Sequence, residues 1–166
     1  VKIAEQLKVS ATPVREAFRK LAKDNLVVIV PWKGVTVKAD TPEEIVALYQ
    51  CREVMEGLGA RLCARHATPE QVEELKELCR EMHAIEDATA RVEVNSRFHS
   101  MIAQFSGNER VVDYLLDFRE RVNRDMYLSS FNAVRTHDCD DEHDHIIDAI
   151  ERHDEVAAEN AMRQHI

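Results

Sequence analysis

The chain has 166 residues, of which 45% are hydrophobic and 32% are charged, and its net charge at pH 7 is −9. This length suits one large domain or two small ones with a real core, and the composition excludes a disordered chain. The longest apolar runs, such as LVVIVPW, fall far short of the roughly 20 residues of a membrane span, so we expect a cytoplasmic protein without membrane contact.

The first 38 residues predict a helix, a tight turn, a second helix and a β-hairpin. Ser10 or Thr12 can cap the second helix, and its first turn tolerates Pro13. That helix carries an apolar stripe at helical spacing, formed by Val14, Ala17, Phe18 and Leu21. LVVIV and VTVK then read as strands on either side of the turn PWKG. This is a winged helix-turn-helix, and the supporting helix that it needs would precede Val1.

From residue 41 onward the pattern is helical. TPEE at 41–44 and TPEQ at 68–71 each place Thr three residues before Glu or Gln, with Pro at the first helical position, which is typical of a helix start. Gly107 suits the left-handed position after a helix end. We expect six helices, at about 42–66, 69–86, 88–105, 109–130, 138–152 and 154–166. Helices without intervening strands predict an antiparallel bundle, so the fold class is mainly α.

The charge divides where the pattern changes. Residues 1–38 contain eight basic and three acidic residues, a net charge of +5, whereas residues 39–166 contain 14 basic and 28 acidic residues, a net charge of −14. We therefore predict two domains, 1–38 and 39–166, with a polyanion as the partner of the first. The four cysteines form no CxxC pair, and we expect buried or half-buried thiols rather than disulfides.

Both parts resemble known families. IAEQLKVSATPVREAFRKLAKDNLVVIVPWKGVTV is similar to the winged helix of GntR-type bacterial transcription regulators. The remainder, with IVALYQCREVMEGLGARLCA, NSRFHSMIAQFSGN and EHDHIIDAIERHDEVAAENAMRQHI, resembles the ligand-binding FCD domain of the FadR subfamily. Two positions depart from the family patterns: Ala11 stands where Arg is frequent, and Asn95 stands where the metal-binding version has Asp. The resemblance implies a DNA-binding regulator, a repressor and not an enzyme, which acts as a homodimer on double-stranded operator DNA.

A recognition helix reads base edges with its first turns in the major groove. Arg15 is the best candidate for a base contact, because a guanidinium can grip guanine through two hydrogen bonds. The alternative for these basic residues is a solvated helix face. Trp32 at the wing tip could be a wedge or a packed ring, and we expect packing. The predicted DNA-contacting residues are Ser10, Thr12, Pro13, Arg15, Arg19, Lys20, Lys33 and Gly34.

Four side chains of the bundle are candidates for one metal ion. Asn95 and His99 are four residues apart, so they project from one helical face. His143 and His165 are 22 residues apart, which suits two antiparallel helices joined by a short turn. The resemblance implies the ligand set Asn95, His99, His143 and His165. Imidazole ligands favour Zn²⁺ or Ni²⁺ ahead of Mn²⁺. We expect Glu142 to point to a different face.

Three neutral imidazoles and an amide leave the +2 charge of the ion uncompensated, so an anionic ligand would be favoured. The resemblance implies a small carboxylate effector, held with help from Arg52 or one of Arg119, Arg121 and Arg124. The alternative for each arginine is a salt bridge to an acid such as Glu53 or Glu120. Two alternatives concern the whole function. The first is the same type of regulator with a metal-independent effector pocket. The second is a metalloenzyme, but the sequence lacks HExxH or a comparable spacing of Glu and His, which argues against it.

Overall fold

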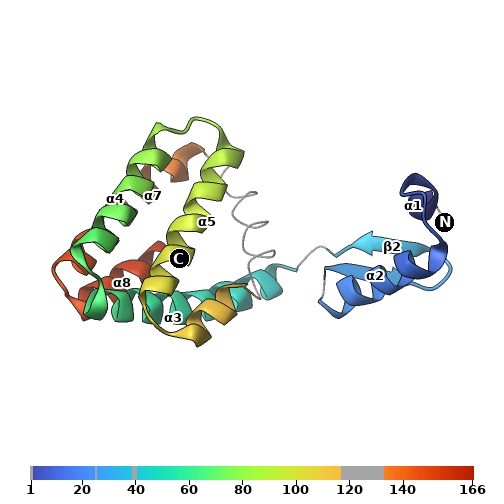
Figure 1. Cartoon of the computed structure of the whole chain (residues 1–166), viewed down its shortest axis with the longest axis horizontal. Coiled ribbons are helices and arrows are strands. Elements are labelled where there is room, and N and C mark those ends of the chain that lie inside the picture. The colour runs from blue at the N-terminus through green and yellow to red at the C-terminus, as the bar shows by residue number, and fades with distance from the viewer. Residues whose placement is uncertain (1, 25, 39–40, 117–132) are drawn as a thin grey trace. The chain divides into compact units, whose positions relative to one another are not determined.

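A computed structural model of the protein describes residues 2–24, 26–38, 41–116 and 133–166. The chain forms two compact units, Val1–Ile45 and Val46–Ile166. In Figure 1 the first unit, drawn in blue tones, contains α1, α2 and β2, and the second unit consists of helices. The predicted fold class, mainly α, is confirmed. Among the described residues, we find no helix with the length and apolar character that crossing a bilayer requires.

The first unit has the predicted order of helix, turn, helix and hairpin. Its elements are α1 (Lys2–Gln6), α2 (Ala11–Lys23), β1 (Val27–Val30) and β2 (Gly34–Val37). Lys8, with φ 55°, lies in the turn between the two helices. Ser10 occupies the N-cap of α2 in an extended conformation, although its hydroxyl makes no capping hydrogen bond. Pro13 is the third residue of α2 and therefore lies in its first turn, where its missing N–H is not needed.

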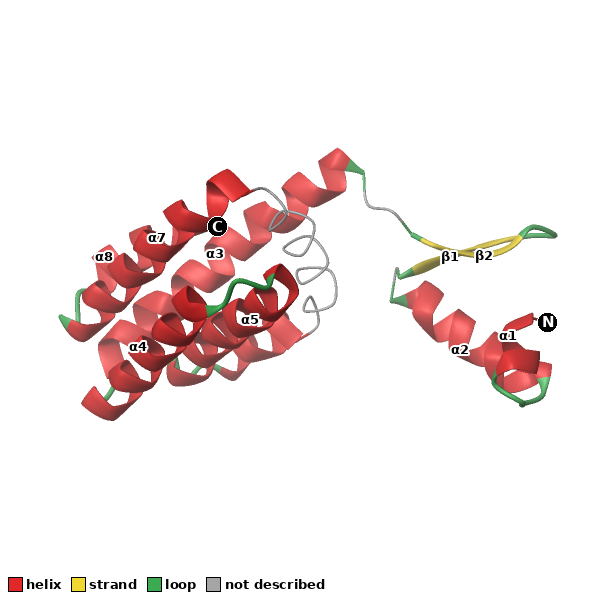
Figure 2. Ribbon diagram, turned by 90° about the horizontal axis from the view of Figure 1, so that it is seen from above, coloured by secondary structure: helices red, strands yellow, loops and turns green. Residues whose placement is uncertain are grey.

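The two strands form an antiparallel hairpin, which Figure 2 shows in yellow. Val30 pairs with Gly34 next to the turn, and the amide of Lys33 donates to the carbonyl of Val30 at 3.1 Å. Gly34 has φ +107°, a conformation that favours glycine. Trp32 is fully exposed in this turn, at 104% of its reference area. The expected packing of Trp32 is wrong, because a three-residue connection leaves its ring no strand face to cover.

The second unit is a helical bundle. Its elements are α3 (Pro42–His66), α4 (Pro69–Ala84), α5 (Ala88–Phe105), a helical stretch at 109–116, α7 (Ala133–Glu151) and α8 (Glu155–His165). The helix predicted at 138–152 begins five residues earlier than expected. The helix predicted at 109–130 is helical as far as residue 116, and the rest of it lies outside the described residues.

The predicted start signals act as reciprocal caps. The amide of Thr41 donates to Glu44 Oε2 at 3.0 Å, and the amide of Glu44 donates to Thr41 Oγ1 at 3.2 Å. Thr68 and Gln71 make the same exchange at the start of α4, at 3.0 and 3.3 Å. Each exchange satisfies two of the amide groups that a helix start leaves unpaired. Gly107 has φ +66°, so the predicted left-handed position after α5 is confirmed.

The core lies where α4 packs against α5 and α7, and where α7 packs against α8. Its largest side chains are almost completely buried: Leu75, Met82, Phe98, Ile102, Ile146, Ile150 and Met162. Cys51, Cys63 and Cys79 are free thiols, although Cys51 is exposed rather than half-buried. Burial raises the pKa of the Cys63 thiol to about 12, which makes it inert as a nucleophile.

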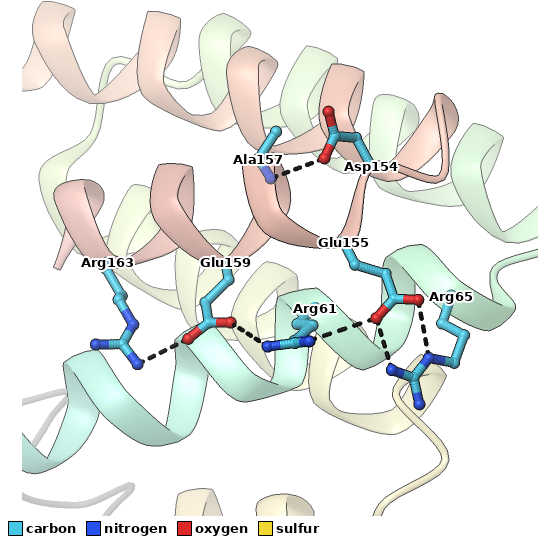
Figure 3. Close-up of polar contacts among 7 residues, drawn as sticks. All are labelled: Arg61, Arg65, Asp154, Glu155, Ala157, Glu159 and Arg163. Atoms are coloured by element: carbon cyan, nitrogen blue, oxygen red, sulfur yellow. Dashed lines mark hydrogen bonds and ion pairs between the residues drawn. The ribbon is translucent and has the colours of Figure 1, made fainter.

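A ladder of ion pairs joins α3 to α8, and Figure 3 shows its central part. Arg65 Nη2 lies 2.6 Å from Glu155 Oε2, and Arg61 contacts both Glu155 and Glu159 at 3.4 and 3.2 Å. A Cβ atom on Gly57 would lie 2.8 Å from Arg163 Cγ, so the lack of a side chain there lets α8 approach α3 closely. The partly exposed ion pairs contribute little energy singly, but they fix how α8 lies along α3.

Thr68→Ala should destabilise the bundle by about 1 kcal/mol, because it removes the hydroxyl that caps α4 and leaves the amide of Gln71 unpaired. Urea unfolding followed by circular dichroism measures this change. Gln71→Glu is the matched control, since a glutamate can still accept from the amide of Thr68 and should leave the midpoint nearly unchanged. An equal loss in both variants would contradict the capping explanation.

Candidate metal centre

Three histidines from three helices meet inside the bundle. His99 comes from α5, His143 from α7 and His165 from the last residue of α8. Each offers one ring nitrogen, and these three atoms all lie within 4.8 Å of one another. His99 is 6% exposed and His143 is 1% exposed, so the cluster lies in the interior rather than on the surface.

Helical spacing places each ring beside the core. His99 directly follows the buried Phe98, His143 lies three residues before Ile146, and His165 lies three residues after Met162. The turn between α7 and α8 reverses the chain, and the carboxylate of Asp154 accepts the amide of Ala157 to start α8. His143 and His165 therefore come together as their spacing predicted, with ring centroids 4.4 Å apart.

A carboxylate lies behind each of two rings. His99 Nδ1 is 2.5 Å from Glu56 Oε2, and His165 Nδ1 donates to Glu142 Oε2 at 2.8 Å. The first contact falls short of an aligned hydrogen bond, and neither of its atoms has another hydrogen-bond partner in the described part of the chain. The contact is therefore electrostatic, with the Nδ1 side of the His99 ring against a buried negative charge. Ionised carboxylates only accept hydrogen bonds, so in the neutral form of each ring they favour the tautomer with the hydrogen on Nδ1 and the lone pair on Nε2.

The two Nε2 atoms face one another. His165 Nε2 lies 3.2 Å from His99 Nε2, and in two neutral rings of this tautomer the buried lone pairs would repel each other unless a cation stood between them. Two imidazole nitrogens that each bind Zn²⁺ at about 2.0–2.1 Å are roughly 3–3.4 Å apart at ordinary coordination angles. The separation of these two nitrogens therefore fits two ligands of one ion.

His143 supplies a third donor. Neither of its ring nitrogens has a hydrogen-bond partner within the described residues, although a buried polar atom normally has one. Burial lowers the pKa of His143 well below its ordinary value, and the neighbouring His165 and His99 lower it further. The ring is therefore neutral, which is the form that binds a metal ion. The edge of Phe98, whose centroid lies 4.8 Å away, holds it in place.

The fourth predicted ligand, Asn95, lies half-buried on α5 one turn before His99. Its role stays a prediction. His145, two residues after His143, is exposed and does not belong to the cluster. Glu142, for which we expected a different face, contacts the Nδ1 side of His165, because α8 returns alongside α7 and brings the ring to it.

Of the predicted effector-binding arginines, the structure places Arg52 beside the centre. Arg52 is 3% exposed, its Nε donates to Glu56 Oε1 at 2.7 Å, and its guanidinium lies 4.9 Å from the Tyr49 ring. The acid that pairs with Arg52 is thus Glu56, and not Glu53 as the alternative suggested. Arg119, Arg121 and Arg124 lie outside the described residues, so their roles stay predictions.

Glu56 is the residue that sequence reasoning missed. Burial by itself raises its pKa, but the electrostatic and hydrogen-bonding interactions with His99 and Arg52 outweigh burial and lower the pKa to about 2. A signal was available: Arg52 and Glu56 are four and eight residues after the buried Leu48, so they share the inward face of α3. Two opposite charges at that spacing on an apolar face indicate a buried polar cluster.

The residues predicted to contact DNA all lie on the surface of the first unit. The side chain of Arg15 is exposed, as are those of the other five predicted residues of α2 and its N-cap. Lys33 in the hairpin turn and Gly34 at the start of β2 are exposed as well. Exposure is what a DNA contact requires, but it does not show one, and these roles stay predictions.

Two family descriptions match the chain. The FCD domain matches residues 47–166, more than half of the chain, and the bacterial regulatory proteins of the gntR family match residues 1–37. The HTH-type transcriptional repressor RspR of Escherichia coli (strain K12) is 28% identical over 99% of this chain and 73% of that protein. The Nta operon transcriptional regulator of Aminobacter aminovorans is 25% identical over 95% of this chain and 76% of that protein. A solved structure of a GntR regulator from Rhodococcus sp. RHA1 is 29% identical to this chain. It aligns over 98% of this chain and 79% of that chain, with a TM-score of 0.75.

His143→Leu should leave the metal-free protein as stable as before, or more stable by about 1 kcal/mol, because it removes a buried polar ring without partners. His99→Leu should instead cost about 1–3 kcal/mol, because it leaves the Glu56 carboxylate buried with one partner fewer. Urea unfolding in the presence of a chelator compares the two. A large loss in His143→Leu would mean that this ring stabilises the fold.

Proposed function

The chain belongs to the GntR family of bacterial regulatory proteins and carries an FCD domain, and we propose that it is a repressor whose FCD domain binds a divalent metal ion and a small carboxylate effector that changes its affinity for operator DNA. It is a bacterial transcriptional regulator, and the proteins it matches are regulators rather than enzymes. The observation that carries the metal part of the proposal is the pair of Nε2 atoms 3.2 Å apart with a carboxylate behind each ring.

The DNA part rests on the GntR match and on charge. The family implies DNA binding through the helix-turn-helix, and residues 1–38 carry a net charge of +5 in a chain that is acidic overall. Arg15 would read a base edge, while Arg19, Lys20 and Lys33 would hold phosphates. Two-fold operators call for two copies of the winged helix, so the proposal includes a homodimer. The repressor sign is supported by the name of the E. coli relative.

The metal would be held by His99, His143, His165 and Asn95. Three neutral imidazoles favour Zn²⁺ or Ni²⁺, with Mn²⁺ after them. A bound ion would supply positive charge and open coordination positions for an anion. Burial keeps the His143 ring neutral, and carboxylates direct the other two rings, so the donors are oriented before the ion arrives.

The effector would be an anion because the centre keeps excess positive charge. Asn95 contributes no charge, and Glu56 is already offset by Arg52. In the part of the chain that the structure describes, the contact with Glu56 uses Nε of Arg52, which leaves the outer guanidinium nitrogens for a carboxylate. An effector can shift DNA binding only by favouring one arrangement of the protein over another.

Zn²⁺ or Ni²⁺ should raise the thermal midpoint of chelator-treated protein, and a matching small carboxylate should raise it further when the ion is present. A ligand at 100 times its dissociation constant stabilises the native state by about 2.7 kcal/mol. His143→Leu is the control, since it removes one donor and should abolish the response to the ion. A carboxylate that acts equally with a chelator present would support a metal-independent pocket, and no response to any acid would contradict the effector class.

Arg15→Ala should weaken binding to an operator selected by the wild-type chain by about 1–3 kcal/mol while leaving non-specific binding almost unchanged, because a base contact is lost. Arg19→Ala, a matched arginine one turn further along α2, should weaken both kinds of binding alike. Fluorescence anisotropy at fixed salt on operator and scrambled duplexes measures this difference. Equal losses on both duplexes for Arg15→Ala would make it a phosphate contact.

A further inference from the structure

A buried carboxylate of α3, that of Glu56, lies beside the proposed metal centre. The inference drawn from it rests on the proposed function. We propose that Glu56 is a positioning residue of the metal centre, which holds the His99 ring so that Nε2 faces the ion and which is itself held in place by Arg52. Glu56 does not touch the ion. It acts through His99.

The contacts of Glu56 support this role. Its two oxygens are divided between two partners: Oε1 accepts from Arg52 Nε at 2.7 Å, and Oε2 lies 2.5 Å from His99 Nδ1. Its side chain is 2% exposed and that of Arg52 is 3% exposed, so water does not compete for either oxygen. A carboxylate fixed on one side by a guanidinium gives His99 an acceptor whose position hardly varies.

The consequence is a choice of tautomer. A neutral imidazole carries one hydrogen, and the acceptor at Glu56 draws it to Nδ1 of His99. The lone pair is then on Nε2, the atom that faces His165 Nε2. With the hydrogen on the other nitrogen, His99 would place a lone pair against a carboxylate and an N–H where the ion should be. A metal-binding histidine is generally oriented in this way by a second hydrogen-bonding group, and its removal typically costs affinity.

Glu142 gives an internal comparison. It makes the equivalent contact to His165 Nδ1 at 2.8 Å, but its side chain is 39% exposed and the structure therefore lets water take its place. No water can replace Glu56 as readily. The difference in exposure predicts that Glu56→Gln lowers the affinity for the ion more than Glu142→Gln does. If only the loss of a negative charge near the ion mattered, the two substitutions would have equal effects.

The other explanation for Glu56 is purely structural, namely a buried ion pair with Arg52 that stabilises α3 in the bundle. A structural carboxylate would affect unfolding but not the affinity of a folded chain for the ion. The Glu53 carboxylate lies on the same helix and contacts Arg163 at 3.5 Å, so Glu53→Gln removes the same charge from α3 away from the His99 ring. It is the matched control.

The test compares the full chain with Glu56→Gln, Glu142→Gln and Glu53→Gln, using Zn²⁺ in competition with a chromogenic chelator and Co²⁺ absorption as a report on ligand geometry. Glu56→Gln should lower Zn²⁺ affinity about 10- to 100-fold and alter the visible Co²⁺ bands, because the ring is no longer fixed. Glu142→Gln should lower affinity less, and Glu53→Gln should match the wild type. Unfolding of each metal-free variant separates a loss of fold from a loss of binding.

A second measurement needs no variant. Histidine ¹⁵N chemical shifts of the wild-type chain should show the hydrogen of His99 on Nδ1, with the Nε2 resonance responding to Zn²⁺. A hydrogen on Nε2 would overturn the role of Glu56 even if Glu56→Gln failed to fold. If the wild type binds Zn²⁺ and a folded Glu56→Gln variant binds it with the same affinity, this inference alone is overturned. No Zn²⁺ binding by the wild type would overturn the proposed metal centre, and this inference with it.

Discussion

The interior of the bundle is organised around two imidazole rings that face each other through Nε2 while carboxylates stand behind their Nδ1 atoms. In the neutral rings each carboxylate favours a hydrogen on Nδ1, so that two lone pairs would converge on a small buried volume. This arrangement is unfavourable unless a cation occupies that volume. The helices around it keep the rings from turning away: Phe98 packs edge-on against His143, and the ion pairs between α3 and α8 fix the helix that carries His165.

The centre reduces the stability that the core could otherwise have. His143 is almost completely buried among apolar residues, yet neither of its nitrogens has a hydrogen-bond partner within the described residues. A hydrocarbon side chain of similar size would avoid that cost. Arg52 and Glu56 are buried as a pair, which is also seldom more stable than apolar packing. Such a concentration of polar groups in one part of a core is typical of a binding site.

Helix α3 is common to most of these interactions. Its inward face carries Arg52 and Glu56, of which Glu56 contacts His99, and Arg61 and Arg65 join α3 to α8. A change at the proposed centre would therefore act on α3 from two sides, through Glu56 and through the helix that ends in His165. In chain order α3 begins at Pro42, shortly after the hairpin of the first unit ends at Val37.

The sequence by itself determined the helices, their starts at Thr41 and Thr68, the hairpin, and the meeting of His143 with His165, because caps, turns and helical spacing are local properties of the chain. It did not determine the exposure of Trp32, the partner of Arg52 or the partner of Glu142. Only the tertiary structure decided these, because each depends on which helix returns beside which. Glu142 on α7 contacts His165 on α8, and Glu56 contacts His99, which is more than forty residues away along the chain. No local sequence pattern specifies either contact.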